Sequence, residues 1–404
     1  MKKKIGLISL AAITILCSCS VENDEVEIDS YVKYDSSLTD TRLLDAIEKV
    51  EDSNVILVNK FSKAPMFGIQ TNVSYDLKSA VVYKNESNKY YCVTEYSQDD
   101  VDASHYIMLG TDYENMILSS LLGYDEINNI AVYTFESDET IGVSDISETY
   151  DSSIGEEIFS IATLGGTTNS LSSFDYNTNA YDLYTGIISF TNGFNIVHGA
   201  MSSEDNKGSA VYDYDGNLLG LNVYKISTQI EVGSKYSETS QLGTLDTSDM
   251  NIAIRCDVLN TIVNQIEEDN VVERPNLGFD IVALRKTYSN YKDIVFYEAY
   301  LQEYAYINGL DEQPYYQYSK NNSNVKFVFP SDVKSGLLVS YDNPNKGSFT
   351  SLQSNDFIVG INDTTIYTLQ EFLNIFLLTR VNDNVTLDVY RNNELITLTK
   401  KTGK

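Results

Sequence analysis

The stretch "SSEDNKGSAVYDYDGNLLGLN", residues 202–222, decides how the chain is interpreted. Its second half predicts a tight hairpin, with an apolar strand, a turn at Asp215 and Gly216, and a second apolar strand. An Asp-Gly pair supplies the positive φ that a short β-turn needs. The first half is a polar loop around Lys207, and the role of that lysine determines which function the hairpin supports.

The same alternation of strands and turns extends over residues 54–265. Ten short apolar runs are separated by polar turns, and almost no long helical period lies between them. This pattern favours an all-β sandwich or a pair of barrels. The runs are NVILVNKF, SAVVYKN, YYCVTEY, HYIMLG, NIAVYTF, EIFSIATLG, YTGIISF, SAVYDY, LLGLNVY and MNIAIR.

Two helices are predicted at the ends of this β-rich unit. TDTRLLDAIEKV, residues 39–50, and DVLNTIVNQIEED, residues 257–269, both repeat apolar residues at helical spacing. Asp257 is the expected N-cap of the second helix. One helix therefore opens the unit and the other closes it.

The C-terminal part changes to a mixed pattern, which predicts a separate compact domain of about 130 residues. We expect helices over residues 291–310, an aromatic-rich segment, and over residues 369–380. The predicted strands are PNLGFDIVAL, GLLVSYD, DFIVGIND, VTLDVYR and LITLTK.

The N-terminus is typical of an export signal. Three lysines precede the uncharged, mostly apolar residues 5–16. That run is shorter than the roughly 20 residues that span a bilayer. LCSC, residues 16–19, resembles a bacterial lipobox with Cys19 as the lipidated residue, and a simple secretory signal is the alternative. We predict a signal peptide over residues 1–18 and an acidic linker over residues 19–40.

Composition excludes several classes of function. The formal net charge of −30 repels phosphate backbones, so nucleic acid is not an expected partner. Two histidines, far apart in sequence, and no Cys-x-x-Cys pair in the mature body give no support for a metal site, and no cofactor is expected. Cys92 and Cys256 are the cysteines of the mature body, as buried thiols or as one disulfide.

The order of these segments resembles the HtrA/Deg family of trypsin-like serine proteases with a C-terminal PDZ domain. The matching segments include LLDAIEKVEDSNVILV, NNIAVYTF, GEEIFSIATLGG, YTGIISF and NKGSAVYDYDGNLLGLN. The resemblance implies a mostly β fold, with a trypsin-like double β-barrel over residues 41–270 and an α+β PDZ domain over residues 271–404.

The resemblance places other residues at all three positions of the family's catalytic triad. Ser97 in VTEYSQD stands at the histidine, Asn129 in NNIAVY at the aspartate, and Lys207 in DNKGS at the serine. A serine needs an imidazole to take its proton and a carboxylate to orient that imidazole. The first glycine of the family's GNSGG loop is Asp205 here, which opposes an oxyanion. The resemblance therefore implies a pseudoprotease.

A working peptidase with a displaced nucleophile is the alternative. Ser209 lies two residues after Lys207 on the same strand face, and a Ser-Lys pair is a known catalytic arrangement. That arrangement needs a lysine whose pKa is lowered, and this acidic sequence gives no sign of one. His198 is interpreted as a loop or wall histidine.

The PDZ half retains more of its expected parts. NLGF, residues 276–279, matches the family's GLGF carboxylate loop at three of four positions. PDZ domains hold a peptide C-terminus by adding it to a strand edge. The resemblance assigns Leu277, Gly278 and Phe279 to the loop, and Asp280 and Ile281 to the edge that pairs with the peptide. Other candidates are Phe372, Ile375 and Phe376 for the opposite wall, and Arg274 and Arg285 beside the carboxylate.

The leading hypothesis is an exported, lipid-anchored protein on the extracytoplasmic face of the cell membrane. It would bind unfolded or C-terminal segments of exported proteins, in envelope quality control or as a scaffold. Family members often trimerise through aromatic residues near the N-terminus, and Tyr31 and Tyr34 are the candidates for a homotrimer here. A surface lipoprotein that binds another ligand is a third hypothesis.

Overall fold

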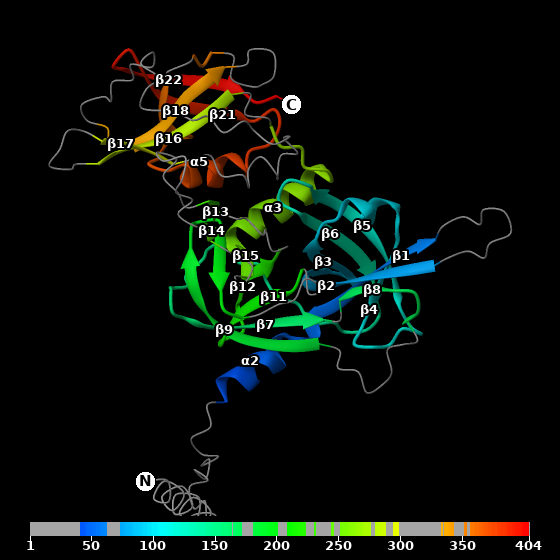
Figure 1. Ribbon diagram of the computed structural model, residues 1–404. Coiled ribbons are helices and arrows are strands. Elements are labelled where there is room, and N and C mark those ends of the chain that lie inside the picture. The colour runs from blue at the N-terminus through cyan, green and yellow to red at the C-terminus, as the bar shows by residue number, and fades with distance from the viewer. Residues whose placement is uncertain are drawn as a thin grey trace, which may run out of the picture. The chain divides into compact units, whose positions relative to one another are not determined.

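The structure is a computed structural model. It describes residues 41–62, 73–163, 165–171, 181–200, 208–223, 230–231, 244–245, 251–275, 279–287, 294–298, 333, 335–342, 351–353 and 356–403. Residues 44–404 form one compact unit, whose helices and strands are labelled in Figure 1.

The first barrel is an antiparallel sheet in the order β1-β4-β5-β6-β3-β2-β8. β1 also pairs with β2, which closes the sheet on itself. Alternate side chains of these strands point inward and form an apolar core, in which Leu57, Val82 and Tyr133 are fully buried. The strands are β1 Asn54–Ser62, β2 Val73–Glu86, β3 Lys89–Glu95, β4 Ser104–Met108, β5 Ile117–Asp125, β6 Ile130–Glu136 and β8 Gly166–Thr168.

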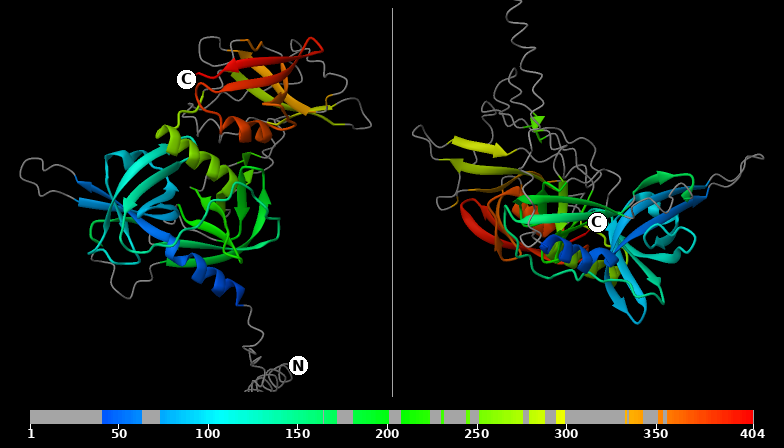
Figure 2. Two further views of the ribbon diagram at one scale, coloured as in Figure 1. Left: turned by 180° about the vertical axis from the view of Figure 1, so that it is seen from behind. Right: turned by 90° about the horizontal axis from the view of Figure 1, so that it is seen from below.

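The second barrel closes in the order β10-β15-β12-β11-β7-β9 (Figures 1 and 2). The hairpin predicted around Asp215 is confirmed as β11 and β12, and Gly216 has the expected positive φ of +76°. The strands are β7 Glu157–Thr163, β9 Tyr181–Thr191, β10 Asn195–His198, β11 Ala210–Asp213, β12 Leu218–Asn222 and β15 Asn251–Arg255. The short strands β13 Ile230–Glu231 and β14 Thr244–Leu245 pair with each other.

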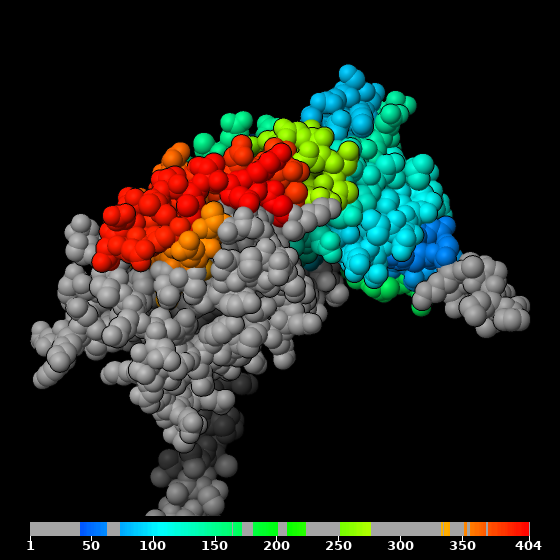
Figure 3. Space-filling view, turned by 90° about the horizontal axis from the view of Figure 1, so that it is seen from above, coloured from blue at the N-terminus to red at the C-terminus, as the bar shows by residue number. Residues whose placement is uncertain are grey.

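The C-terminal sheet has the strand order β17-β16-β18-β19-β21-β22, with β20 beside β19. Helix α5, Leu369–Phe376, packs on it through Phe372 and Phe376. β22 is an edge strand with many exposed side chains, and its surface is red in Figure 3. The strands are β16 Phe279–Thr287, β17 Ile294–Glu298, β18 Ser335–Asp342, β19 Phe357–Ile361, β20 Thr364–Thr365, β21 Asn384–Arg391 and β22 Glu394–Lys401.

The two helices predicted around the β-rich unit are confirmed as α2, Arg42–Val50, and α3, Cys256–Asp269. The prediction that Asp257 caps α3 was wrong. The N-cap is Arg255, and Asp257 lies in the first turn, where its carboxylate accepts hydrogen bonds from Arg255 Nε at 3.0 Å and Nη2 at 2.6 Å. Two short 3₁₀ helices, Glu51–Ser53 and Gln98–Asp102, complete the described helices.

The aromatic-rich helix predicted over residues 291–310 is contradicted where the structure describes it. Ile294–Glu298 forms β17, paired antiparallel with β16. Its residues, IVFYE, are mostly β-branched or aromatic, and these residue types favour strands when a neighbouring edge is available. The helix predicted over residues 369–380 is shorter than expected, because α5 ends at Phe376.

Cys92 and Cys256 are both buried free thiols, which decides between the two alternatives that the sequence left open. Among the described residues, no helix is long and apolar enough to span a membrane. No group of three or more metal-ligating side chains occurs in that part of the chain either.

Candidate functional site

The paired ends of β3 and β6 bring two of the predicted triad positions together. Glu95 at the end of β3 pairs with Ile130 at the start of β6. Ser97 follows β3 and Asn129 precedes β6, so both residues lie at this end of the sheet. The backbone N–H of Tyr96 donates to the carbonyl of Asn129 at 2.8 Å, which holds the two segments side by side.

The third position, Lys207, lies outside the described residues, but the next residue is described. Gly208 has a φ of +76°, and a Cβ at this position would overlap the Thr94 hydroxyl and the Ser79 carbonyl. Only glycine fits such a positive φ and so close an approach of two backbones. The hairpin that follows Lys207 therefore begins against β2 and β3, close to the segment that carries Ser97.

Neither described triad position carries an acid or a base. Ser97 is exposed, and its hydroxyl cannot take a proton near neutral pH. Asn129 has a left-handed backbone with φ +54°, a conformation that asparagine adopts more readily than most residues. The backbone conformation suits asparagine, whose amide cannot stabilise an imidazolium as a carboxylate would.

A buried carboxylate lies beneath Ser97. Asp100 is 0% exposed and accepts hydrogen bonds from Lys78 Nζ at 2.7 and 2.8 Å, from Asn59 Nδ2 at 2.8 Å and from the backbone N–H of Ser97 at 2.9 Å. A carboxylate offers about four acceptor sites, so these four hydrogen bonds occupy all the acceptor sites of Asp100. The carboxylate anchors the loop after β3 to the barrel through an ion pair with Lys78.

His105 extends this buried network. Its Nδ1 lies 2.9 Å from Asn59 Oδ1. Because Asn59 Nδ2 donates to Asp100, its oxygen must accept, and the neutral imidazole therefore carries its proton on Nδ1. Burial lowers the pKa of His105 and keeps the ring neutral. Burial and the charge of Asp100 raise the pKa of Tyr133, whose ring packs edge-on against the imidazole. The hydrogen bond to Asn59 and the packing against Tyr133 thus hold the ring of His105 in the barrel interior.

A second buried network surrounds Ser209, the alternative nucleophile. Ser209 is 0% exposed, and its hydroxyl accepts a hydrogen bond from Asn222 Nδ2 at 2.9 Å. His198 Nε2 lies 2.8 Å from Asn222 Oδ1, so an amide stands between the imidazole and the hydroxyl. Because an amide does not relay a proton as a general base, and a buried hydroxyl cannot meet a substrate, this packing supports a structural role for Ser209.

The predicted peptide groove is described in part. Leu277 and Gly278 lie outside the described residues. Phe279, Asp280 and Ile281 begin β16, whose backbone pairs with β18 along one edge. The strand predicted to receive a peptide is therefore present.

The opposite wall of the groove differs from the prediction. Phe372 and Phe376, at 0% and 2% exposure, stack with ring centroids 5.7 Å apart in the apolar core of the C-terminal sheet. Ile375 is partly buried against the same core. The helical spacing places these apolar residues on one face of the helix. It does not show whether that face lines a groove or packs in a core. The two phenylalanines serve the core.

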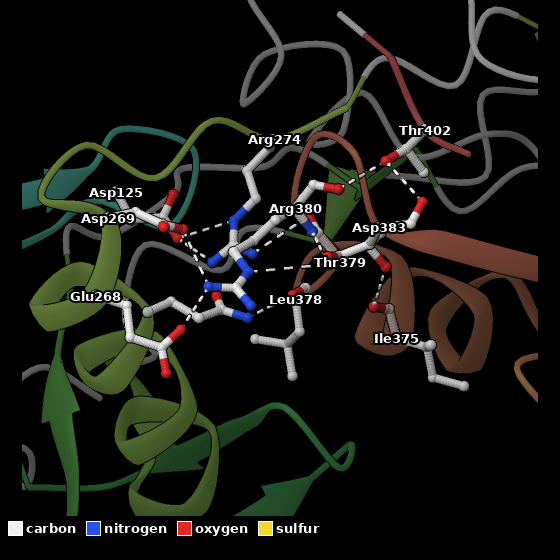
Figure 4. Close-up of polar contacts among 11 residues, drawn as sticks. Asp125, Glu268, Asp269, Arg274, Ile375, Leu378, Thr379, Arg380, Asp383 and Thr402 are labelled. Atoms are coloured by element: carbon white, nitrogen blue, oxygen red, sulfur yellow. Dashed lines mark hydrogen bonds and ion pairs between the residues drawn. The ribbon is translucent and has the colours of Figure 1, made fainter.

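Arg274, a candidate to assist the peptide carboxylate, forms a buried ion pair with Asp125 (Figure 4). Its Nε lies 3.0 Å from Asp125 Oδ2, and its Nη1 donates to the carbonyl of Thr379 at 3.3 Å. The two charged side chains are 3% and 0% exposed. Asn128 Nδ2 also donates to the carbonyl of Leu377 at 3.1 Å. The turn before Asn129 is thereby joined to the segment that follows α5. For Arg285, the structure gives only the backbone pairing within β16.

A more exposed ion cluster adjoins this junction. Arg380 Nη1 lies 2.7 Å from Glu268 and 3.0 Å from Asp269, at the end of α3 (Figure 4). Its side chain is 30% exposed, and exposed pairs of this kind contribute little to stability.

Sequence reasoning missed the residues that organise the triad region: Lys78, Asp100, Asn59 and Asn222. The one available signal was Lys78, which directly precedes the apolar run SAVVYKN within β2. A polar residue inside a strand indicates a buried partner, but the partner lies 22 residues away and only the closed barrel brings it near.

Two closed antiparallel barrels followed by an antiparallel sheet with one packed helix define a trypsin-like double barrel with a C-terminal PDZ domain. The model of the PDZ domain family matches residues 323–402, which begin after β16 and β17. Two relatives are named "Serine protease Do-like HtrA". The one from Lactococcus lactis subsp. lactis (strain IL1403) is 22% identical, over 95% of this chain and 81% of the relative. The one from Bacillus subtilis (strain 168) is 20% identical, over 88% and 72%.

Solved structures share the fold. An "HtrA-type protease AlgW with decapeptide" has a TM-score of 0.54 and 17% identity, over 89% of this chain and 98% of that chain. A serine endoprotease from Yersinia pestis has a TM-score of 0.51 and 15% identity, over 89% and 97%. The chain is thus similar to HtrA/Deg family proteins over most of its length, and its C-terminal part matches the PDZ domain family.

Proposed function

We propose that this protein binds polypeptides, including C-terminal peptides through its PDZ domain, and does not cleave them. It would act in protein quality control or as a scaffold at the cell envelope. The observation that carries the proposal is the pair Ser97 and Asn129. The two segments adjoin, and the resemblance assigns these residues to the family's histidine and aspartate positions, with no imidazole or carboxylate side chain of their own.

The second support is the use of the nearby ionisable groups. Asp100 and Lys78 neutralise each other in the barrel interior, and His105 bonds to Asn59 in the same network. A base for peptide hydrolysis must reach the proton that it abstracts. These side chains instead form the buried network that holds the loop after β3.

The test is hydrolysis of unfolded casein, together with labelling by a fluorophosphonate probe. We expect no cleavage and no labelling by the wild-type protein. The matched variant is Lys207→Ala. If the wild-type protein cleaves casein and Lys207→Ala abolishes the cleavage, the proposal is wrong. Labelling at Ser209 would instead favour the displaced nucleophile.

Peptide binding is supported by the match to the PDZ domain family and by the likeness to an "HtrA-type protease AlgW with decapeptide". By the resemblance, Leu277, Gly278 and Phe279 would bind the C-terminal carboxylate of the peptide, and Asp280 and Ile281 would pair with its backbone. The affinity for a peptide should therefore depend on its free C-terminal carboxylate. An amidated copy of the same peptide is the matched control.

Membrane anchoring and assembly form part of the proposal. The N-terminal sequence supports lipidation at Cys19 and residence on the extracytoplasmic face of the cell membrane. Metabolic labelling with palmitate should be lost in Cys19→Ser, and label that persists would contradict the anchor. A homotrimer through Tyr31 and Tyr34 predicts a trimer mass in sedimentation that falls to monomer in Tyr31→Ala/Tyr34→Ala.

A further inference from the structure

The connecting segment between α3 and the C-terminal sheet, residues 270–274, is built into the first barrel. The backbone N–H of Tyr124 in β5 donates to the carbonyl of Asn270 at 2.8 Å, and the N–H of Val272 donates to the carbonyl of Tyr124 at 3.0 Å. A Cβ at Gly123 would overlap the Asn270 carbonyl, so only glycine permits this close approach. Segments that join mobile domains are exposed and make few contacts. This segment is instead hydrogen-bonded to β5.

Three consecutive carbonyls at the end of α5 receive donors from outside the C-terminal sheet and its helix. The pairs are Asn128 Nδ2 with Leu377 O at 3.1 Å, Gln265 Nε2 with Leu378 O at 2.9 Å, and Arg274 Nη1 with Thr379 O at 3.3 Å (Figure 4). Residues 377–379 continue the winding of α5, and the carbonyls at such an end have no partner within the helix. The first barrel, α3 and the connecting segment therefore cap α5.

Arg274 links these parts through one buried side chain. It forms the ion pair with Asp125, and the two side chains are almost completely buried. Asp125 also accepts hydrogen bonds from the backbone N–H of Asn128 at 3.2 Å and from its Nδ2 at 2.7 Å. The same carboxylate thus orders the turn after β5 and holds the arginine that reaches Thr379. β5, the connecting segment and the end of α5 consequently share one buried network.

Two further contacts extend this junction. The backbone N–H of Val381, after α5, donates to the carbonyl of Glu273 in the connecting segment at 2.9 Å. Asn374 Nδ2, in α5 itself, donates to the carbonyl of Asn192 at 2.6 Å. Asn192 lies in the turn between β9 and β10, so the helix also contacts the second barrel.

We propose that these contacts lock the C-terminal sheet and α5 to the barrels as one cooperative unit, with Arg274 as the latch. Motion between domains is the ordinary expectation for a junction within a chain. Here such motion would have to uncap α5, break contacts of a buried arginine and lift the connecting segment from β5. The lock goes beyond the proposed function and does not depend on peptide binding.

The first test measures a distance across the junction by double electron–electron resonance on the full mature chain. Spin labels are attached at Asp138→Cys, after β6, and at Glu394→Cys, in β22, because both positions are exposed. Cys19→Ser removes the thiol near the N-terminus, while Cys92 and Cys256 are buried. We expect one narrow distance distribution in this background. A broad distribution would overturn the lock.

The latch is tested with Arg274→Met/Asp125→Asn. This double variant removes both charges, so no buried charge is left without its partner. We expect the distance distribution to become at least about twofold broader, because the domains then move independently. Arg380→Ala breaks only more exposed pairs and is the matched control, with an unchanged width. An unchanged width in the double variant, or equal broadening in the control, would overturn the role of Arg274.

A second variant acts on the connecting segment alone. Gly123→Ala places a Cβ against the Asn270 carbonyl, whereas at the control Gly199→Ala the nearest described atom lies 3.8 Å away. Urea unfolding is followed by hydrogen exchange of β6 and of β21. In the wild-type protein and in Gly199→Ala, both strands should lose protection at one common urea concentration. Gly123→Ala should separate the two midpoints. Separate midpoints in the wild-type protein, or a common midpoint in Gly123→Ala, would contradict the lock.

Discussion

The carboxylate beneath Ser97 is fully hydrogen-bonded, whereas, among the described strands, the backbone along the first half of β16 is paired on one edge only. Below Ser97, the carboxylate of Asp100 receives every hydrogen bond that it can accept, and Lys78 neutralises its charge. Along residues 279–282, the described sheet leaves one backbone edge of β16 without a strand partner. Polar groups that are fully paired inside a barrel stabilise it, whereas unpaired edge groups are available to a ligand. Under the proposed function, recognition would therefore depend on backbone pairing more than on reactive side chains.

The largest expected effect is on the Lys78 and Asp100 pair. Asp100→Ala leaves a buried ammonium without its partner, and we expect a loss of about 3–5 kcal/mol in the free energy of unfolding. Urea unfolding followed by tyrosine fluorescence measures it. The control is Asp99→Ala, at an exposed neighbouring position, which should change stability by less than about 0.5 kcal/mol. Equal losses in the two variants would mean that the network does not hold this region.

The second effect tests whether Arg274 serves the fold or the peptide. Arg274→Ala removes the partner of Asp125, which is 0% exposed, and should cost about 3 kcal/mol. The control Arg380→Ala breaks only exposed pairs and should cost less than about 1 kcal/mol. Peptide affinity should stay within about twofold in both variants. A variant of Arg274 that folds with unchanged stability but loses peptide binding would place this arginine in the groove.

Ser209→Ala should have a smaller effect. It removes the neutral hydrogen bond from Asn222 Nδ2, worth about 1 kcal/mol, and a long contact of 3.5 Å with the Ser160 hydroxyl. Ser153→Ala, at an exposed serine, is the control, and its stability should barely change. Neither variant should alter the background rate of casein hydrolysis. Loss of a measurable hydrolysis rate in Ser209→Ala alone would support the displaced nucleophile.

The smallest effect is a pH dependence from His105. Burial lowers its pKa in the folded state below the ordinary value of 6.5. Above pH 6.5 both states are neutral, and the full stability is present. As the pH falls below 6.5, the unfolded chain binds a proton that the folded chain does not, so stability decreases. The loss of stability between pH 7.5 and 5.5 should be smaller in His105→Gln than in the wild-type protein. An identical loss in the two proteins would contradict a buried, neutral imidazole.

The sequence predicted most strands of both barrels because short apolar runs stand between polar turns. It missed β5, β8 and β10, which are barrel strands without such a run. It predicted the hairpin because the turn requires Asp215 and Gly216. It failed for β17, where the aromatic run has no clear period and the available edge of β16 decides the outcome. It also failed for Asp257, since a capping pattern does not show that Arg255 binds the carboxylate.

The residues of the candidate site could be predicted only where they lie in a recognisable sequence motif. Ser97 and Asn129 were placed by the resemblance, and the pairing of β3 with β6 brings them together. The ion pair of Lys78 with Asp100 and the bond of Asn222 to Ser209 join residues far apart in sequence. Neither follows a periodicity or a spacing, so the closed barrels are needed to reveal them.

The most direct test of the central claim measures binding and cleavage on one sample. A ten-residue peptide with a free C-terminus is titrated into the full mature chain by calorimetry, and the same mixture is then analysed by mass spectrometry after prolonged incubation. The account predicts saturable binding, loss of that binding with the amidated peptide, and an intact peptide mass. A peptide that is cleaved by the wild-type protein and spared by Lys207→Ala would contradict it.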